Sequence, residues 1–296
     1  MPELPEVETV VRSLQGVLPG RRILNVRLGK TDFIEDPAAL ERDLPGSRVT
    51  SVRRHGKFLV VALESAAGAA PAGSLLIHLG MTGQILVGPP EAPIAPHTHV
   101  FFALDDGREF RYVDVRRFGK MRMLSGDSSE APLEKLGLDP LEITERQFVD
   151  LVQSRNARIK ALLLDQSVLR GMGNIYTDES LWRARIHPRR MGASLKAAEL
   201  KRLYRAMQEI LKEAIRLKGS SISDYVDADG NRGEFQLKHR AYGRLGKKCF
   251  RGDGVIHRAI VAGRSSYFCP ACQPAPRHAR KPRKRIEPAR RGKPRR

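Results

Sequence analysis

Short apolar runs separated by turn residues dominate the first half of the chain, after one amphipathic helix at the amino terminus. Val7, Val10 and Leu14 recur at helical spacing behind Pro5, and the pattern ends at Pro19. Short β-rich segments follow at 22–28, 48–54, 57–63, 74–79, 99–104, 109–113 and 120–124. This half is therefore expected to form a β-rich domain.

Helical periodicity replaces this pattern in the second half. Leu200, Leu203 and Met207 share the clearest apolar face, over 195–217, and a shorter helix is expected at 178–185 behind a glycine turn. A loop at 219–233 and a cysteine-bearing hairpin at 242–273 follow. The organisation expected is a first domain over 1–126, a linker over 127–140, a helical domain over 141–240, a finger over 241–273 and a tail over 274–296.

The net charge of the chain indicates the kind of partner that it binds. The 296 residues include 53 Lys and Arg against 33 Asp and Glu, a formal net charge of +20. About half of this excess lies in the proline-rich tail, which has too few apolar residues to fold alone. The remaining body is also basic, and phosphate backbones are the commonest partner of such a surface.

Several classes of protein are excluded. The longest apolar run, 58–63, is far shorter than the ~20 residues that span a bilayer, and the amino terminus is acidic where a secretory signal is basic. Three cysteines are too few for a disulfide scaffold, which is typical of a reducing compartment. We expect a cytoplasmic, nucleoid-associated protein with no membrane partner.

The amino terminus carries candidate chemistry. Removal of Met1 would leave Pro2 with a free secondary amine, which can attack a carbonyl-like carbon and form an iminium. Its reference pKa is about 8, and Glu3 stands beside it as a candidate for proton transfer. Taken alone, the same residues are also ordinary capping composition at a helix start.

The whole opening segment, residues 1–10, resembles the start of the formamidopyrimidine-DNA glycosylase family. Further motifs of that family follow in the same order, and the resemblance covers residues 1 to about 273. These motifs are Lys57, then HLGMTG at 78–83, DVRRFG at 114–119, GNIY at 173–176, YGR at 242–244 and CPACQ at 269–273.

The resemblance implies an α+β fold. It has an N-terminal β-sandwich flanked by helices and a C-terminal helix–two-turn–helix domain with a zinc-finger-like β-hairpin. It also implies a monomeric bifunctional DNA glycosylase and AP lyase. Such an enzyme flips oxidised purines (8-oxoguanine and formamidopyrimidines) out of double-stranded DNA. It excises them through a Schiff base on Pro2, and then cleaves the abasic site by β,δ-elimination.

The resemblance also implies roles for individual residues. Pro2 and Glu3 would be catalytic, with Glu6 and Lys57 in support. Met81, Arg116 and Phe118 would enter the duplex and fill the hole left by the flipped base. The phosphates would be held by His78, Lys160, Asn174, Tyr242 and Arg264. The loop over the flipped base would begin at Lys218, Gly219, Ser220 and Ser221.

The finger departs from the family pattern of two Cys-x2-Cys pairs sixteen residues apart. Gly252 stands at the second cysteine position with the spacing preserved, so three thiol ligands for Zn²⁺ remain: Cys249, Cys269 and Cys272. Asp253 or His257 is a candidate fourth ligand, and a metal-free finger stays open as the alternative.

Two alternative functions remain. Endonuclease VIII, the sister enzyme for oxidised pyrimidines, shares much of the pattern, but Leu4 with the Arg116 and Phe118 pair favours the purine branch. A non-catalytic DNA-binding protein on the same scaffold would not require the amino-terminal proline and its acidic neighbours.

Overall fold

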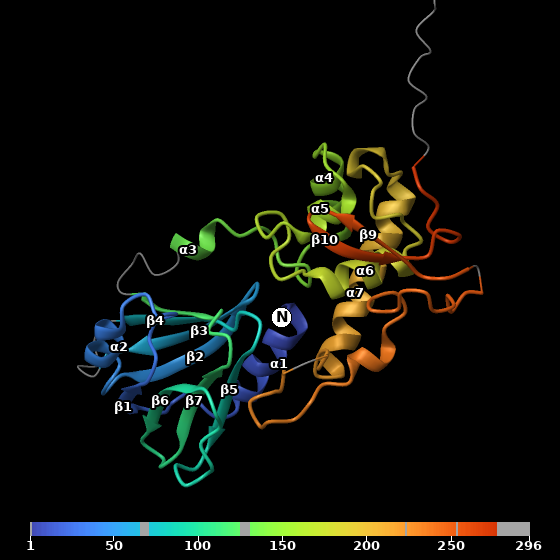
Figure 1. The fold of residues 1–296 in the computed structure, drawn as a ribbon. Coiled ribbons are helices and arrows are strands. Elements are labelled where there is room, and N and C mark those ends of the chain that lie inside the picture. The colour runs from blue at the N-terminus through green and yellow to red at the C-terminus, as the bar shows by residue number, and fades with distance from the viewer. Residues whose placement is uncertain (1, 66–70, 125–130, 223, 253, 277–296) are drawn as a thin grey trace, which may run out of the picture.

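The computed structural model describes residues 2–65, 71–124, 131–222, 224–252 and 254–276. Its first half contains two four-stranded antiparallel sheets. One sheet has the order β1 (Ile23–Leu28), β6 (Thr98–Leu104), β7 (Glu109–Asp114) and β5 (Gly83–Gly88). The other has the order β2 (Arg48–His55), β3 (Phe58–Glu64), β4 (Pro71–His78) and β8 (Lys120–Leu124). The expected β-sandwich is confirmed (Figure 1).

Strand β3 shows why the longest apolar run in the sequence lies here. Leu59, Val61 and Leu63 point into the core between the sheets, whereas Val60 belongs to a second cluster on the outer face. That cluster includes Leu133 of the short helix α3 (Ala131–Glu134), inside the expected linker. A strand buried on both faces has no polar side, so its sequence reads as continuous rather than alternating.

Two elements of the first half were absent from the sequence-based expectation. Strand β5 begins and ends with glycine and buries few apolar side chains, so it lacks the pattern on which strand prediction depends. Helix α2 (Pro37–Asp43) has only seven residues, and Asp36 caps it by accepting a hydrogen bond from Ala39 N at 3.0 Å.

The second half is helical. Its core is formed by α4 (Glu145–Gln153), α5 (Ile159–Leu164), α6 (Asn174–Arg183) and α7 (Ala197–Arg216). The helix expected at 178–185 is α6, which begins four residues earlier because Gly173 already occupies its N-cap. Single turns of 3₁₀ helix, η1 (Gly192–Ser194) and η2 (Phe235–Lys238), occur in the connections. The part of the chain described contains no helix long and apolar enough to cross a membrane.

The expected finger contains a two-stranded hairpin, β9 (His257–Val261) and β10 (Arg264–Phe268). Ala262 and Gly263 connect the strands with φ values of 51° and 68°. Two consecutive left-handed residues are typical of the tight turn that suits the twist of a hairpin. Arg264 is therefore the first residue after the turn.

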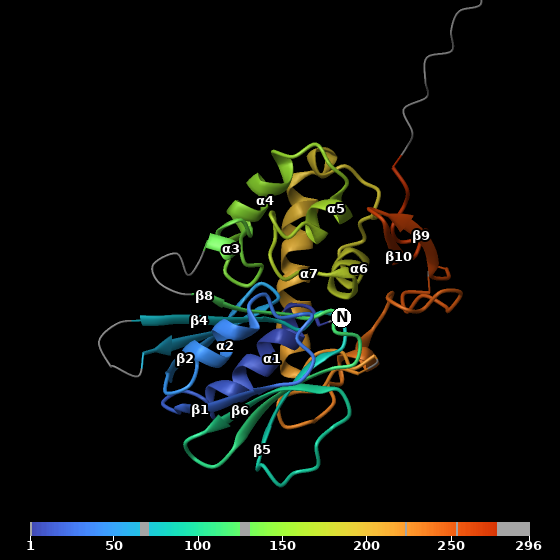
Figure 2. The same ribbon diagram turned by 60° about the vertical axis from the view of Figure 1, so that its left-hand side comes forward.

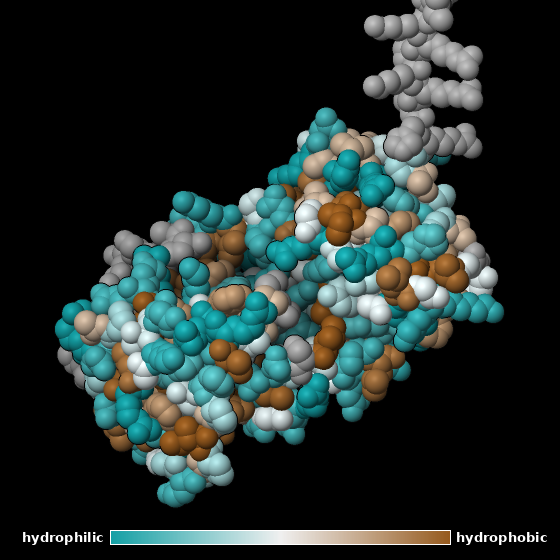
Figure 3. Space-filling model, viewed as in Figure 1, coloured by the Kyte–Doolittle hydropathy of each residue, from teal (hydrophilic) through white to brown (hydrophobic). Residues whose placement is uncertain are grey.

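Helix α1 (Leu4–Gln15) joins the two halves. Leu4 packs in the helical core, whereas Val7 and Val10 pack in the sandwich core. The amino terminus consequently lies between the halves, as two views agree (Figures 1 and 2). The molecular surface is hollowed at the same place (Figure 3).

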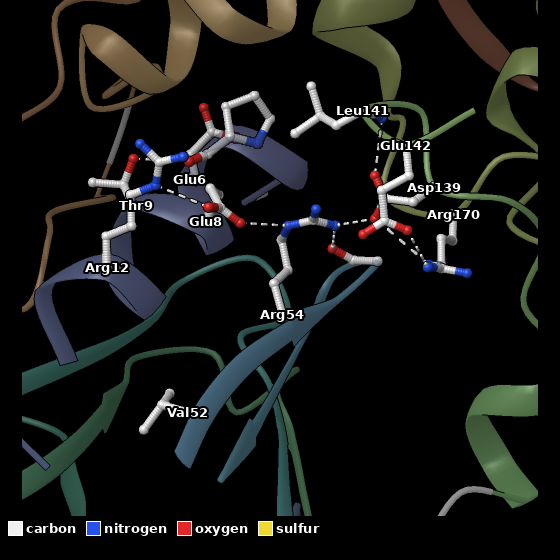
Figure 4. Close-up of polar contacts among 12 residues, drawn as sticks. Glu6, Glu8, Thr9, Arg12, Val52, Arg54, Asp139, Leu141, Glu142 and Arg170 are labelled. Atoms are coloured by element: carbon white, nitrogen blue, oxygen red, sulfur yellow. Dashed lines mark hydrogen bonds and ion pairs between the residues drawn. The ribbon is translucent and has the colours of Figure 1, made fainter. Parts of the chain in front are cut away.

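A buried arginine, Arg54, links the two halves at this junction. Arg54 extends from β2 and donates to Glu8 of α1 at 2.9 Å and to Asp139 at 2.7 Å (Figure 4). Asp139 is 2 % exposed and also faces Arg170, at 3.6 Å. One guanidinium therefore ties α1 and the sandwich to the start of the helical half.

Replacing Arg54 with methionine should lower the free energy of unfolding by about 3 kcal/mol, because Asp139 would lose its nearest counter-charge while buried. Urea unfolding would measure the loss. The matched control is Arg12→Met, since Arg12 pairs with the same Glu8 but is 61 % exposed and should cost less than about 0.5 kcal/mol. Equal losses for both variants would contradict this role of Arg54.

Candidate active site

The Glu3 carboxylate lies at the amino-terminal end of α6. Its Oε1 accepts a hydrogen bond from Ile175 N at 3.0 Å, and its Oε2 accepts one from Tyr176 N at 3.4 Å. The first amides of a helix have no partner inside the helix and carry partial positive charge, so they suit a carboxylate. A residue at one end of the sequence is thus fixed by a helix that begins 171 positions later.

Glycines make this approach possible. A Cβ on Gly173 would lie 2.2 Å from Glu3 Cδ, and one on Gly171 would lie 2.9 Å from Leu4 Cβ. Gly171 also accepts a hydrogen bond through its carbonyl from Leu4 N at 3.0 Å. The amino-terminal segment therefore packs directly against the glycine turn before α6.

Glu6 lies one turn into α1 and connects three segments of the chain. Its carboxylate accepts hydrogen bonds from Glu3 N at 2.8 Å, from Ser220 N at 2.7 Å and from the hydroxyl of Tyr176. Gly219 allows this contact, since a Cβ there would meet Glu6 Oε1 at 2.8 Å. Glu6 thus links the start of α1 to α6 and to the loop after α7.

Burial changes the acidity of these groups. It raises the pKa of Glu3, against the opposing effects of Lys57 and the two amides. It raises the pKa of Glu6 to about 7, and the nearby Glu3 charge adds to the effect. A carboxyl whose pKa is raised can hold a proton near neutral pH, which is what a proton donor requires.

Lys57 lies in the two-residue turn between β2 and β3 rather than in the strand where the sequence placed it. Burial lowers the pKa of its ammonium; Glu3 opposes this shift and Arg264 adds to it, so both charges act on Lys57. The side chain is 8 % exposed. Pro2, next to Glu3, is buried as well. The four predicted catalytic positions therefore belong to the same junction.

The three residues expected to enter the duplex lie together on the surface of the sandwich. Arg116 donates to Met81 Sδ at 3.4 Å, and its guanidinium lies 4.4 Å from the centre of the Phe118 ring. Met81 and Phe118 are 40 % and 54 % exposed. The loop between β4 and β5 and the loop between β7 and β8 thus carry one exposed cluster, Met81, Arg116 and Phe118, which we call the wedge.

Asp114, which the sequence analysis did not single out, holds these loops together. Its buried carboxylate accepts hydrogen bonds from the Thr82 hydroxyl at 2.5 Å, from Gly119 N at 2.9 Å and from Tyr112 at 3.1 Å. It stands first in the DVRRFG motif, so its place in that motif was the signal that could have found it. Its contacts fix the backbone on both sides of the wedge.

Residues expected at phosphates have different environments. His78 accepts a hydrogen bond from Gly80 N at 3.1 Å, and burial lowers its pKa to about 4, so it is neutral at physiological pH. Tyr242 is half-buried against Tyr267, with ring centres 5.3 Å apart. Arg264 is exposed at the hairpin turn and is the best placed of the set to reach a ligand.

Lys160, another residue expected at a phosphate, forms a buried ion pair in this structure. Its side chain is 0 % exposed and pairs with Asp178 at 2.6 Å. Burial raises the pKa of Asp178 to about 7 and lowers that of Lys160, while each partner opposes the shift of the other. Asn174 donates to Ser265 O at 2.9 Å. In this structure both side chains bind the hairpin strand rather than face the hollow.

The expected start of the loop over the flipped base is firmly held. Ser220 and Ser221 are buried, and the Ser221 hydroxyl donates to Tyr225 O at 2.7 Å. Lys218 pairs with Asp227 at 2.8 Å. Tyr225 itself packs in the sandwich core, so this loop crosses from the helical half onto the first domain. These four residues form the base of the loop, and Ile222 beyond them is exposed.

The three cysteines come together as expected. Their sulfur atoms lie within 4.8 Å of one another, and all three side chains are buried. His257 does not join this group, because it is exposed on β9. Asp253, the other candidate fourth ligand, lies outside the described residues. Two further groups face the sulfurs: Trp182 Nε1 donates to Cys249 at 3.4 Å, and Arg251 lies 3.6 Å from Cys272.

Comparisons with known proteins agree with this geometry. The chain is 44 % identical to the formamidopyrimidine-DNA glycosylase of Solibacter usitatus over 277 residues, covering 92 % of this chain and 99 % of that protein. It is 43 % identical to that of Heliobacterium modesticaldum, covering 92 % and 100 %.

Solved structures agree too. Lactococcus lactis Fpg, in complex with DNA containing N7-benzyl-Fapy-dG, superposes with a TM-score of 0.83 at 33 % identity, covering 93 % of this chain and all of that one. The Thermus thermophilus MutM (Fpg) protein gives 0.79 at 40 % identity, covering 92 % and 98 %.

Fold, site and relatives define the class of protein: a DNA glycosylase that also has AP lyase activity. Residues 1–121 match the model of the formamidopyrimidine-DNA glycosylase N-terminal domain, and residues 136–226 match that of its H2TH domain. The chain belongs to the formamidopyrimidine-DNA glycosylase family. The predicted family and enzyme class are thereby confirmed.

Proposed function

We propose that the chain excises oxidised purines, formamidopyrimidines and 8-oxoguanine, from double-stranded DNA through a covalent Schiff base on Pro2. One observation carries this proposal: the buried Glu3 carboxylate, adjacent to Pro2, is held by the amides of α6 where the two halves of the chain meet. Binding DNA alone would not require a carboxyl with a raised pKa at that place.

The chemistry follows from the groups present. Once Met1 has been removed, the Pro2 nitrogen attacks C1′ of the damaged nucleotide, and the C1′–N9 bond breaks with its electron pair leaving on the base. The nitrogen then loses its proton, which neutralises the departing base and frees the nitrogen lone pair. A proton from Glu3 at the sugar ring oxygen then lets the C1′–O4′ bond open, which leaves an iminium between Pro2 and C1′. This iminium acidifies the C2′ proton, so loss of that proton expels the 3′ phosphate; a second elimination expels the 5′ phosphate.

The wedge supports base flipping. A flat ring and a thioether can replace lost stacking, while the Arg116 guanidinium can pair with the cytosine left without its partner. Relatives support the choice of substrate, because Lactococcus lactis Fpg was solved with DNA containing Fapy-dG derivatives and with DNA containing an abasic site.

Borohydride trapping tests the proposal. A duplex with 8-oxoguanine opposite cytosine should give a stable protein–DNA adduct, whereas an undamaged duplex should give none. An adduct mainly with oxidised pyrimidines would show the endonuclease VIII preference instead. No adduct with any lesion, after mass spectrometry has confirmed that Met1 is absent, would leave a non-catalytic DNA-binding protein.

We propose further that the finger binds one Zn²⁺ through Cys249, Cys269 and Cys272. Three buried sulfurs within 4.8 Å of one another fit three corners of a tetrahedral site, in which zinc would fasten the hairpin base. Metal analysis should give about one zinc per chain, falling below a tenth in Cys269→Ser. A metal-free wild-type protein with an intact hairpin would overturn this assignment.

The basic tail should add sequence-independent affinity for DNA. Each tail cation that contacts a phosphate contributes about 0.9 to the slope of log affinity against log salt. Deleting residues 274–296 should flatten that slope and leave single-turnover excision nearly unchanged. A full-length tail with its Lys and Arg changed to Gln should behave like the deletion; an unaltered slope in either variant would refute the role.

The location and oligomeric state belong to the proposal as well. We infer that the protein acts as a monomer in the bacterial cytoplasm, at the nucleoid. The net charge of +20 and the three free cysteines support that environment.

A further inference from the structure

The outer edge of β10 binds side chains of the helical half. Ser265 and Tyr267 stand two residues apart on this strand, so their backbone groups point the same way. Ser265 O accepts a hydrogen bond from Lys160 Nζ at 3.0 Å, and Tyr267 N donates one to Asp178 Oδ2 at 2.8 Å. The hairpin accordingly lies against α5 and α6 (Figure 1).

Lys160 and Asp178 form a buried ion pair, and each of the two side chains also makes a hydrogen bond to the backbone of β10. Their charged atoms are 2.6 Å apart, and their side chains are 0 % and 1 % exposed. Asn174 adds a second donor to Ser265 O, at 2.9 Å. We call Lys160, Asn174 and Asp178 the edge clamp. Together they bind the Ser265 carbonyl and the Tyr267 amide, two backbone groups that a neighbouring strand would bind in a larger sheet.

A hairpin of two strands is marginally stable alone, so its place depends on what binds its edge. Arg264 comes directly before Ser265 and directly after the turn. Fixing Ser265 therefore fixes the backbone from which the exposed Arg264 side chain extends. The charge of Arg264 lowers the pKa of Lys57, so the two cations act on each other. The cysteines act elsewhere, since Cys269 follows the far end of β10.

We propose that Asp178 is a positioning residue that holds Arg264 at the DNA, acting through Lys160 and the backbone edge of β10. The proposal rests on the proposed function and on the phosphate contact that the family resemblance implies for Arg264. Asp178 touches neither DNA nor the reacting atoms. It orients Lys160, binds Tyr267 N, and so keeps the turn of the hairpin at a fixed distance from the catalytic junction.

A double-mutant cycle in the full-length chain tests this. DNA affinity and its salt dependence are measured for Arg264→Ala, Asp178→Asn and the double variant, on a duplex containing a stable abasic analogue. Each single variant should lose about tenfold in affinity and about one unit of salt slope. If Asp178 acts through Arg264, the double variant should be little weaker than Arg264→Ala alone.

Two further variants control for folding. Thr177→Val replaces a buried side chain of the same helix whose hydroxyl has no partner in the described structure, and should bind DNA like the wild type. The paired change Lys160→Met with Asp178→Leu removes both charges together, leaves no buried ion unpaired, and should reproduce the affinity loss with zinc content unchanged.

The outcomes separate the two claims. If Arg264→Ala leaves affinity and slope intact, the phosphate contact that the family resemblance implies for Arg264 is wrong. If Arg264→Ala weakens binding but the folded clamp variants do not, or if the losses add in full, the positioning role of Asp178 is wrong.

Discussion

Replacing Gly173 with alanine should reduce single-turnover base excision by roughly 10²–10³-fold, the range expected when a positioned proton donor or hydrogen-bond donor is lost. The new Cβ would lie 2.2 Å from Glu3 Cδ and 2.4 Å from Oε1. The atoms that it meets belong to the far end of the Glu3 side chain, so this side chain must move and its carboxylate must leave the amides of Ile175 and Tyr176. Rapid-quench measurement on an 8-oxoguanine duplex would give the rate.

Gly16→Ala is the matched control. Gly16 caps the C-terminal end of α1, the helix whose N-cap is Glu3, with φ −79°, and a Cβ there would meet nothing closer than 3.8 Å. This variant should excise the base at the wild-type rate. The DNA affinity of Gly173→Ala should change far less than its rate of base excision, because Glu3 is buried. A Gly173→Ala enzyme that excises the base at the wild-type rate would show that the hydrogen bonds from α6 to Glu3 are dispensable.

A chain with a peptide extension ahead of Pro2 should form no borohydride-trapped adduct and should not cleave an abasic site. The extension turns the proline nitrogen into an amide, whose lone pair is delocalised and cannot attack C1′. The loss should be at least about 10³-fold, since a single group drives both base release and strand cleavage.

Proteolytic removal of the extension supplies the control. Activity and adduct formation should return together when the amino-terminal proline is freed, and both samples should bind an abasic-analogue duplex. An extended chain that nicks lesion DNA at the wild-type rate would exclude Pro2 as the nucleophile. A restored adduct without restored strand cleavage would separate the lyase step from this amine.

The positions of the strands could be read from the sequence where burial is regular. Strands β2, β3 and β8 carry enough buried apolar residues, in a continuous run in β3 and interrupted by a bulge in β2, for the expected bounds to agree with the structure to within one residue. β5 could not be found this way, because it begins at Gly83, where close packing excludes a side chain: a Cβ there would lie 2.4 Å from Leu79 O. Tertiary contact, not local preference, makes it a strand.

The site divides in the same manner. The motifs of the family located Pro2, Glu3, Glu6 and Lys57, because residue type alone is equally typical of a helix start or a solvated surface. The partners that fix them were not visible, because backbone amides carry no sequence signal. Glu179 illustrates this: its buried carboxylate accepts hydrogen bonds from the amides of residues 240–242, which it meets only in the folded chain. The family resemblance placed Lys160 at a phosphate, and nothing in the sequence indicated that Lys160 also forms a buried ion pair with Asp178.

The hydrogen bond from Ser220 N to Glu6 links the position of the loop after α7 to the pKa of the Glu6 carboxyl. An amide that donates to a carboxylate lowers its pKa, so any movement of the loop base that lengthens this 2.7 Å contact makes Glu6 more basic. By reciprocity, protonating Glu6 weakens its grip on the loop. With a pKa of about 7, Glu6 can exchange its proton at physiological pH, so lesion capture should take up or release hydrogen ions.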